Sequence, residues 1–318
     1  AMYQDVGKLA TAAANADDPE YREKLATSAA ALAAWGKKTE SRSRIEAMIH
    51  LAQSRPGIAV LAGNLDTDPL LFNCNNGTLD LRYASLRPAD PADCITKLAP
   101  IDYDPNARLE MFEQFLGTIL PDAEVRSFVQ RSLGYCLTGL GTEEKMFFAY
   151  GPTATGKSSL LRGVITAMGD YAATADFGTF LQQDRTGRAT NDIARLAGKR
   201  LVTSIEVDEG QKMAEALVAQ ITGGDVVSAR FLYGESFEFV PTFKVWLAAN
   251  NRPRVRDDND ANWRRIVQIP FDQQIPEEDR DASIKAALAD ASVSGPAVLA
   301  WLVEGCLAWQ LVGLGTPD

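Results

Sequence analysis

The chain has 318 residues, of which 46% are apolar and 23% are charged, so it is long enough for one large or two smaller globular domains. Its net charge of −10 argues against a protein whose whole surface binds nucleic acid, although a local basic patch is allowed. No apolar run reaches the roughly 18 to 20 residues that a membrane-spanning helix needs, and no signal-peptide pattern is visible, so we expect no membrane contact.

Cysteine and histidine are too few and too dispersed for a zinc site or a disulfide framework. The four cysteines include no CxxC pair, and His50 is the only histidine. Zinc sites need several such ligands at short spacing, and disulfide scaffolds are dense in cysteine. We therefore expect reduced, buried cysteines and a cytoplasmic protein.

The first 140 residues predict a mainly helical domain that contains a small β element. Residues 1–55 are rich in Ala, and their apolar residues recur at helical spacing, which indicates two or three helices. Within residues 57–102, short apolar runs flank an Asn76-Gly77 turn, which predicts a β-hairpin. Residues 109–140 return to a helical pattern.

From residue 141 onward, strand and helix signals alternate, which is typical of an α/β domain. Short apolar strands are predicted at 145–150, 200–205, 244–249 and 266–270, with helices at 158–168 and 211–221. The sequence therefore predicts an α/β core over residues 141–275. A C-terminal helical segment is predicted to follow over residues 276–318.

Residues 151–158 read GPTATGKS, a full match to the phosphate-binding loop GxxxxGK[ST]. The loop follows a predicted strand and precedes a predicted helix, as the chemistry requires. Glycines at 151 and 156 let backbone N–H groups approach phosphate oxygens, Lys157 supplies positive charge and Ser158 a hydroxyl for Mg²⁺. The predicted ATP-binding residues are Gly151, Pro152, Thr153, Ala154, Thr155, Gly156, Lys157, Ser158 and Ser159.

Polar residues follow the next two predicted strands of the core. Glu206, Asp208 and Glu209 come directly after strand 200–205, and Asn250 follows strand 244–249. One carboxylate can hold Mg²⁺ and another can polarise the attacking water, while an amide can orient that water. We expect Ser158, Glu206 and Asp208 to hold the metal; which of the three acids activates water stays open.

Basic residues cluster near the fourth predicted strand of an otherwise acidic chain. Arg264 and Arg265 are candidates for an arginine that stabilises charge on a neighbouring subunit's phosphates. Residues 226–240 read as a hairpin that carries Arg230 and Tyr233, suited to holding a DNA backbone and stacking on a base. The predicted DNA-binding residues are Arg230, Tyr233, Lys244, Arg252 and Arg254.

Four segments, in this order along the chain, resemble the motifs of the superfamily 3 helicases. They are GPTATGKS, RLVTSIEVDEG, the 226–240 hairpin with KVWLAANNRP, and ANWRRIVQIPF. The resemblance is greatest to the phage and plasmid primase-helicase family related to poxvirus primase-helicases. The segment NGTLDLR to VQRSLGYCLTG is similar to the region that precedes the helicase core in that family, where residues 1–140 would act as a collar or in oligomerisation.

The resemblance implies an AAA+-type P-loop fold and an ATP- and Mg²⁺-dependent DNA helicase. It implies that Lys157 contacts ATP, that Glu206 with Asp208 or Glu209 forms the acidic motif, and that Asn250 is the sensor. It also implies that Arg265, or else Arg264, is the arginine finger. The family usually forms a hexameric ring that threads one DNA strand, moves 3′ to 5′ and works at a fork with a primase domain or replication initiator. A phage- or plasmid-encoded chain would act in the bacterial cytoplasm.

Two other functions stay open at this stage. A nucleotide-switched ATPase could load or remodel a replication complex without unwinding DNA. A small-molecule kinase is a weaker alternative, because no lid or acceptor-site motif accompanies the P-loop.

Overall fold

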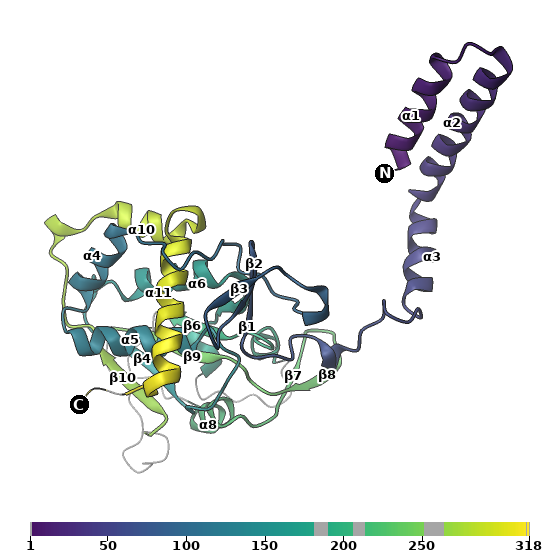
Figure 1. Cartoon of the computed structure of the whole chain (residues 1–318). Helices are drawn as coiled ribbons and strands as arrows, with labels where there is room; N and C mark the ends of the chain where they lie inside the picture. The colour runs from purple at the N-terminus through teal and green to yellow at the C-terminus, as the bar shows by residue number, and fades with distance from the viewer. Residues whose placement is uncertain (1, 181–189, 206–213, 251–263, 316, 318) are drawn as a thin grey trace. The chain divides into compact units, whose positions relative to one another are not determined.

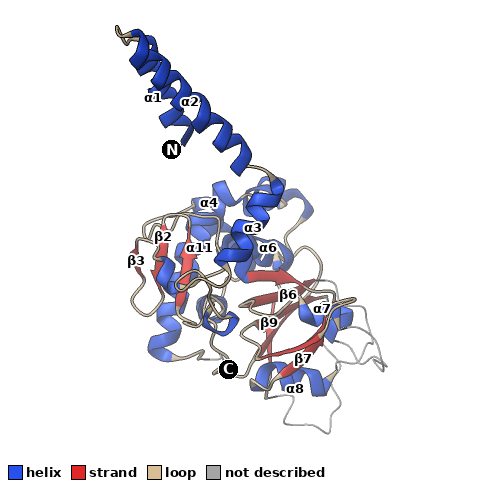
Figure 2. Cartoon of the chain, turned by 90° about the vertical axis from the view of Figure 1, so that its right-hand side faces the viewer, coloured by secondary structure: helices blue, strands red, loops and turns tan. Residues whose placement is uncertain are grey.

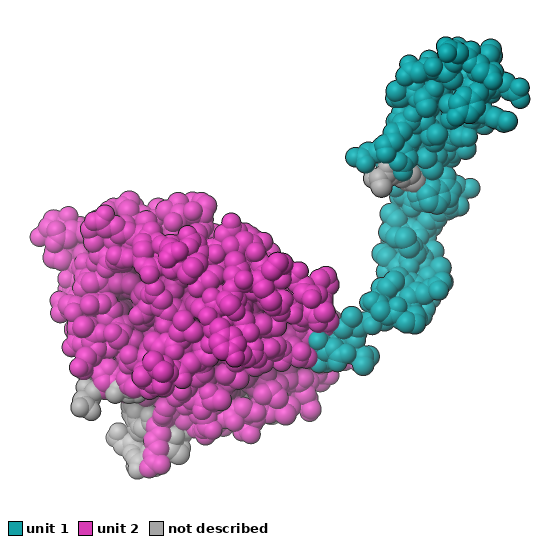
Figure 3. All heavy atoms as spheres, in the orientation of Figure 1, with its two compact units in different colours: residues 1–64 teal, residues 65–318 magenta. Residues whose placement is uncertain are grey.

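The computed structural model of the chain describes residues 2–180, 190–205, 214–250, 264–315 and 317. Two compact units are formed, Ala1–Asn64 and Leu65–Asp318, which are coloured separately in Figure 3. The boundaries predicted after residues 140 and 275 both lie inside the second unit. The helices on either side of the P-loop domain are thus part of the same compact body as the domain itself.

The first unit is a group of three helices, as the sequence predicted. Helix α1 (Met2–Ala14) lies beside α2 (Pro19–Thr39), and α3 (Arg42–Ala52) follows (Figures 1 and 2). Asp18 caps α2, because its side chain accepts a hydrogen bond from the Glu20 N–H at 3.0 Å. Few residues of this unit are buried, and the side chains of Trp35 and Met48 are 56% and 65% exposed.

The second unit is built on a five-stranded sheet, all of whose neighbouring strands are parallel. This confirms the predicted α/β fold class, and four of the five strands lie where the sequence placed them. In order across the sheet the strands are β10 (Ile266–Pro270), β4 (Met146–Tyr150), β9 (Lys244–Ala249), β6 (Leu201–Ile205) and β5 (Ala172–Thr174).

Side chains alternate between the two faces of this sheet, and both faces are covered. Phe147 and Trp246 belong to one core, which they form with α4 (Glu110–Ile119), α5 (Ala123–Tyr135), α6 (Lys157–Met168) and α11 (Ala291–Val312). Phe148 and Leu247 belong to a second core with α8 (Glu215–Gly223) and the short helix η4 (Phe177–Phe180). Burial on both faces explains why these strands read as continuous apolar runs.

Helix α11 is the longest and most apolar helix of the second unit. Its length and composition would allow it to cross a membrane, but Val298, Leu302 and Cys306 are fully buried in the core. The helix passes α5 at backbone contact: a Cβ added to Gly305 would lie 2.1 Å from the Gln130 carbonyl oxygen. We therefore interpret α11 as a core helix.

Smaller elements complete the unit. The predicted hairpin at Asn76-Gly77 is present, as β1 (Leu71–Cys74) and β2 (Gly77–Asp80), and β3 (Ser85–Arg87) extends it to a three-stranded antiparallel sheet. The other described elements are α7 (Asn191–Ala194), β7 (Val227–Arg230), β8 (Ser236–Phe239), α10 (Ala282–Ala289) and the short helices η1 (Ala62–Asn64), η2 (Pro91–Asp93), η3 (Gly169–Tyr171) and η5 (Glu277–Asp279).

Candidate nucleotide site

The P-loop lies at the edge of the parallel sheet where the strands end. Strand β4 runs directly into Gly151, and the pairing of Tyr150 with Ala249 places Asn250 beside it. Strand β6 ends at the same edge, since Ile205 pairs with Ala248. Open α/β sheets bind ligands beyond the carboxyl ends of their strands. The acidic residues Glu206, Asp208 and Glu209, which follow β6, lie outside the described residues.

The backbone of the loop has a conformation that requires its two glycines. Gly151 has φ +147°, and a Cβ at this position would lie 2.1 Å from the Phe271 carbonyl oxygen. Gly156 has φ +80°, and a Cβ there would lie 2.5 Å from Ile119 Cγ2. Ala154 also adopts a positive φ, of 59°, which few non-glycine residues do. The loop is thus held in a tight turn against β10 and α4.

Backbone donors are available at this turn. Within the described part of the chain, the N–H groups of residues 153–156 donate to no other described residue. Gly156 is also the N-cap of α6, whose first N–H groups have no carbonyl partner inside the helix. A helix amino terminus that follows a glycine-rich turn is suited to binding an anion such as phosphate.

Lys157 is buried at the centre of the loop. Its side chain is folded back, so that Nζ donates to Gly151 O at 2.8 Å, Pro152 O at 2.7 Å and Thr155 Oγ1 at 2.8 Å. All three acceptors are uncharged, and burial lowers the pKa of the ammonium group from its ordinary value. A bound anion would offset this desolvation. Ser158, in contrast, is exposed.

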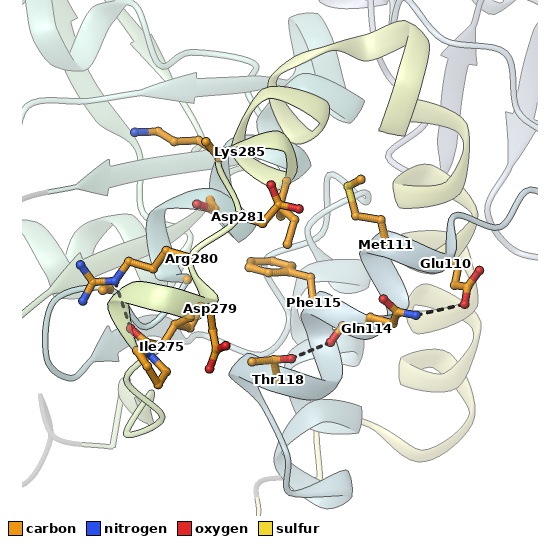
Figure 4. A pocket seen from close by; sticks show the side chains of 16 residues that line it. Glu110, Met111, Gln114, Phe115, Thr118, Ile275, Asp279, Arg280, Asp281 and Lys285 are labelled. Atoms are coloured by element: carbon orange, nitrogen blue, oxygen red, sulfur yellow. Dashed lines mark hydrogen bonds between the residues drawn. The ribbon is translucent and has the colours of Figure 1, made fainter.

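A cavity of about 910 Å³ adjoins the loop between α4 and residues 275–285 (Figure 4). Ala154 and Gly156 of the loop and Ser159 of α6 line one side of it. Phe115 projects from α4 into the space that Ile275 lines from the other side. The Ile275 N–H donates to Ala154 O at 2.9 Å, which fixes this segment to the loop. The cavity residues outside the P-loop could not be predicted from the sequence, because no motif marks them.

The two candidate arginines lie at the opposite edge of the sheet from the P-loop of their own chain. They precede β10, whose first residue pairs with Met146, the first residue of β4. Arg264 is exposed. Arg265 is held within the chain, since its Nη1 lies 3.1 Å from Glu144 Oε2 and donates to Thr222 Oγ1 at 3.1 Å. Neither arginine therefore lies beside the P-loop of its own chain.

Lys244 was predicted to bind DNA, and the structure corrects this assignment. The side chain begins β9 at the amino-terminal edge of the sheet, is only 3% exposed, and donates to the carbonyl oxygens of Thr138, Leu140 and Thr242. Its burial lowers the pKa from 10.5 to about 7. An amine enclosed by carbonyl groups of its own chain is not accessible to DNA.

The predicted DNA hairpin is formed by β7 and β8. Arg230 is exposed at the end of β7, and Tyr233 in the turn is fully exposed with φ 61°. Phe231 and Phe237 stack at 5.5 Å between ring centroids and connect the turn to β8. The remaining predicted DNA contacts, Arg252 and Arg254, lie outside the described residues.

Comparison with known proteins supports the resemblance seen in the motifs. A sequence family described as D5 N terminal like matches residues 3–121, and a family of unknown function (DUF5906) matches residues 149–265. The protein named Putative helicase L207/L206 of Acanthamoeba polyphaga mimivirus is 32% identical over 216 residues, covering 65% of this chain and 22% of its own. Putative helicase 121R of Invertebrate iridescent virus 3 is 27% identical over 266 residues, or 78% and 28% of the two chains. The resemblance to the primase-helicase family is confirmed.

Structural comparison finds a similar fold among solved structures. Two solved apo structures of the NrS-1 C-terminal region superpose with a TM-score of 0.51, at 12% and 11% sequence identity. Each match covers 69% of this chain and 54% of the other chain. The chain spans less than a third of the length of the viral relatives described above.

Proposed function

We propose that the chain is the ATP-hydrolysing, strand-separating part of a DNA replication protein of a phage, prophage or plasmid. It would bind ATP with Mg²⁺ in the host cytoplasm, assemble as a hexameric ring and move 3′ to 5′ on single-stranded DNA at a fork. A primase domain or replication initiator is the expected partner. The observation that carries the proposal is the P-loop, whose backbone donors and buried Lys157 occur at the carboxyl edge of the sheet beside Asn250.

The geometry suits a nucleoside triphosphate. The phosphates would bind at the amino terminus of α6, and the cavity beside the loop would take the nucleoside, with Phe115 and Ile275 offering apolar surface to the base. Ser158, Glu206 and Asp208 would hold Mg²⁺, which would neutralise charge that develops on the phosphates. Lys157 would move from its neutral partners to the phosphate oxygens.

The test is ATP turnover with and without single-stranded DNA, together with strand displacement from duplexes that carry a 3′ or a 5′ tail. Lys157→Ala is expected to lose turnover and displacement, and Lys24→Ala, which changes an exposed lysine of α2, is the matched control. A folded Lys157→Ala protein with wild-type turnover would refute the proposal. Turnover without any strand displacement would favour the loading or remodelling ATPase.

The position of the arginines supports ATP sites shared between subunits. Arg264 is exposed at the edge of the sheet opposite its own P-loop, so we propose that it reaches a neighbour's γ-phosphate; Arg265 is already engaged by Glu144 and Thr222. Mixing the inactive variants Lys157→Ala and Arg264→Ala should restore part of the activity, because some interfaces then combine an intact loop with an intact arginine. Wild-type turnover by Arg264→Ala alone would overturn this assignment.

A further inference from the structure

Arg265 joins three segments of the chain at the amino-terminal edge of the sheet. Its guanidinium lies 3.1 Å from Glu144 Oε2 and donates to Thr222 Oγ1 at 3.1 Å. Its backbone oxygen accepts from the Met146 N–H at 2.7 Å. The residue therefore connects the start of β10 with the start of β4 and with the end of α8.

Thr222 is the residue of α8 that accepts the hydrogen bond from Arg265, and its hydroxyl also donates one. The residue is 7% exposed; its Oγ1 donates to Val218 O at 2.7 Å and accepts from Arg265. Both the donor and the acceptor capacity of this hydroxyl are used, so its position is well defined. A change in the position of Arg265 would act on α8 through this hydroxyl and through Gly223, beside which the guanidinium also lies.

Helix α8 ends at the base of the hairpin. The chain turns at Gly224, with φ +73°, and β7 begins three residues later. Gln220 of the same helix donates from Nε2 to Val226 O at 2.9 Å, which fixes the base of the hairpin to α8. The exposed Tyr233 is thus connected to Arg265 through one short helix.

Arg264 shares a peptide bond with Arg265, and this bond is rigid. Its side chain is exposed, while its backbone oxygen accepts from Lys145 Nζ. A pull on the Arg264 side chain from the γ-phosphate of a neighbouring subunit would act on the backbone that Arg264 shares with Arg265, and a movement of that backbone would shift Arg265. The contacts to Glu144 and Thr222 are then the groups that oppose or transmit this movement.

We propose that Arg265 is a positioning residue that couples the nucleotide of a neighbouring subunit to the DNA hairpin, through Thr222 and α8. Arg265 does not touch the nucleotide in this arrangement. The inference rests on the proposed function, because it requires Arg264 to act on the neighbour's ATP and the hairpin to contact DNA. It adds a path by which hydrolysis at one interface is transmitted to the strand-separating element.

The test replaces Thr222, whose hydroxyl accepts the hydrogen bond from Arg265, by a side chain of the same size without a hydroxyl. In Thr222→Val, turnover without DNA should stay at the wild-type level, while stimulation by single-stranded DNA and displacement per ATP should fall at least roughly fivefold, the lower end of measured coupling between sites. Thr222→Ser keeps the hydroxyl and should restore both. Thr138→Val is the matched control, because it removes another buried hydroxyl, which donates to Tyr135 O at 2.9 Å, away from this path.

Glu144→Gln tests the same path from a partly exposed side chain and should also weaken DNA stimulation without changing turnover in the absence of DNA. Wild-type stimulation in both Thr222→Val and Glu144→Gln would overturn the coupling and leave the proposed function intact. Equal losses in Thr222→Val and Thr138→Val would also overturn it. A wild-type chain whose turnover ignores DNA would instead refute the proposed function, and the coupling with it.

Discussion

Raising the pH from 7 to 9 is expected to stabilise the second unit, because Lys244 is buried among carbonyl groups. Burial lowers the pKa of this amine from 10.5 to about 7 in the folded chain, whereas the unfolded chain keeps the ordinary value. Between pH 7 and pH 10.5 the unfolded chain therefore binds more protons, and the free energy of unfolding rises with pH. Since half of the folded chains have already lost this proton at pH 7, the gain from pH 7 to pH 9 is about 2 kcal/mol, at about 1.4 kcal/mol per pH unit for the full slope.

Groups that face Lys244 limit the pH range over which the free energy of unfolding rises. Burial raises the pKa of the Cys136 and Cys306 thiols from 9.0 to about 12. Above pH 9 these thiols keep their protons in the folded chain and lose them in the unfolded chain, so they lower stability as the pH rises. Arg200 also lies near and disfavours a charged Lys244. The rise should therefore level off near pH 9.

The assay is urea unfolding followed by tryptophan fluorescence at pH 7, 8 and 9, under reducing conditions. Lys244→Met keeps the length of the side chain and removes the titration, so its unfolding midpoint should not rise over this range. Lys285→Met changes an exposed lysine and should keep the wild-type trend. A wild-type midpoint that stays constant or falls from pH 7 to 9, or a rise that persists in Lys244→Met, would refute the reasoning.

Three further predictions concern the site, the core and the hairpin. Glu206→Gln should retain ATP binding and lose most hydrolysis. Nucleotide affinity and ATP turnover, measured on the same preparation, test this. Normal turnover would place the essential acid at another position. Gly305→Ala should destabilise the chain by about 1 to 3 kcal/mol or more in urea unfolding, because its Cβ would clash with the Gln130 carbonyl oxygen; an unchanged midpoint would contradict the close packing. Arg230→Ala and Tyr233→Ala should each lower the affinity for single-stranded DNA, measured by fluorescence anisotropy. In Arg230→Ala, the affinity should also depend less on salt concentration. Wild-type affinity in both variants would make the hairpin purely structural.

The strands and the P-loop could be predicted from local sequence, because the signals for them are local. A strand covered on both faces must be apolar throughout, as in MFFAY and KVWLAA, and the loop needs glycine at fixed positions. Strand β5 (Ala172–Thr174) was missed, since three residues of AAT show no period. Its place comes from pairing with β6, which no local pattern reveals.

Other features depend on contacts between distant residues and could not be predicted. Lys244 at the start of a strand resembles a surface cation; its burial is caused by carbonyl groups of Thr138 and Leu140, more than 100 residues earlier in the chain. The cavity beside the P-loop is assembled from α4 and residues 275–285. Arg264 and Arg265 are adjacent in sequence. Only the packing around them makes the side chain of Arg264 exposed and that of Arg265 an ion-pair partner of Glu144.

The position of α11 has a consequence for how the chain folds. This helix packs against α5, where Gln130 Nε2 donates to the Trp301 carbonyl oxygen across 171 residues of sequence. Such non-local contacts raise contact order and delay the completion of a core. During synthesis, the apolar faces of α5 and α6 stay uncovered until α11 has emerged from the ribosome, so the nascent chain exposes a surface that binds chaperones or aggregates. Truncations that remove α11 should therefore yield insoluble protein, even though every residue of the P-loop is retained.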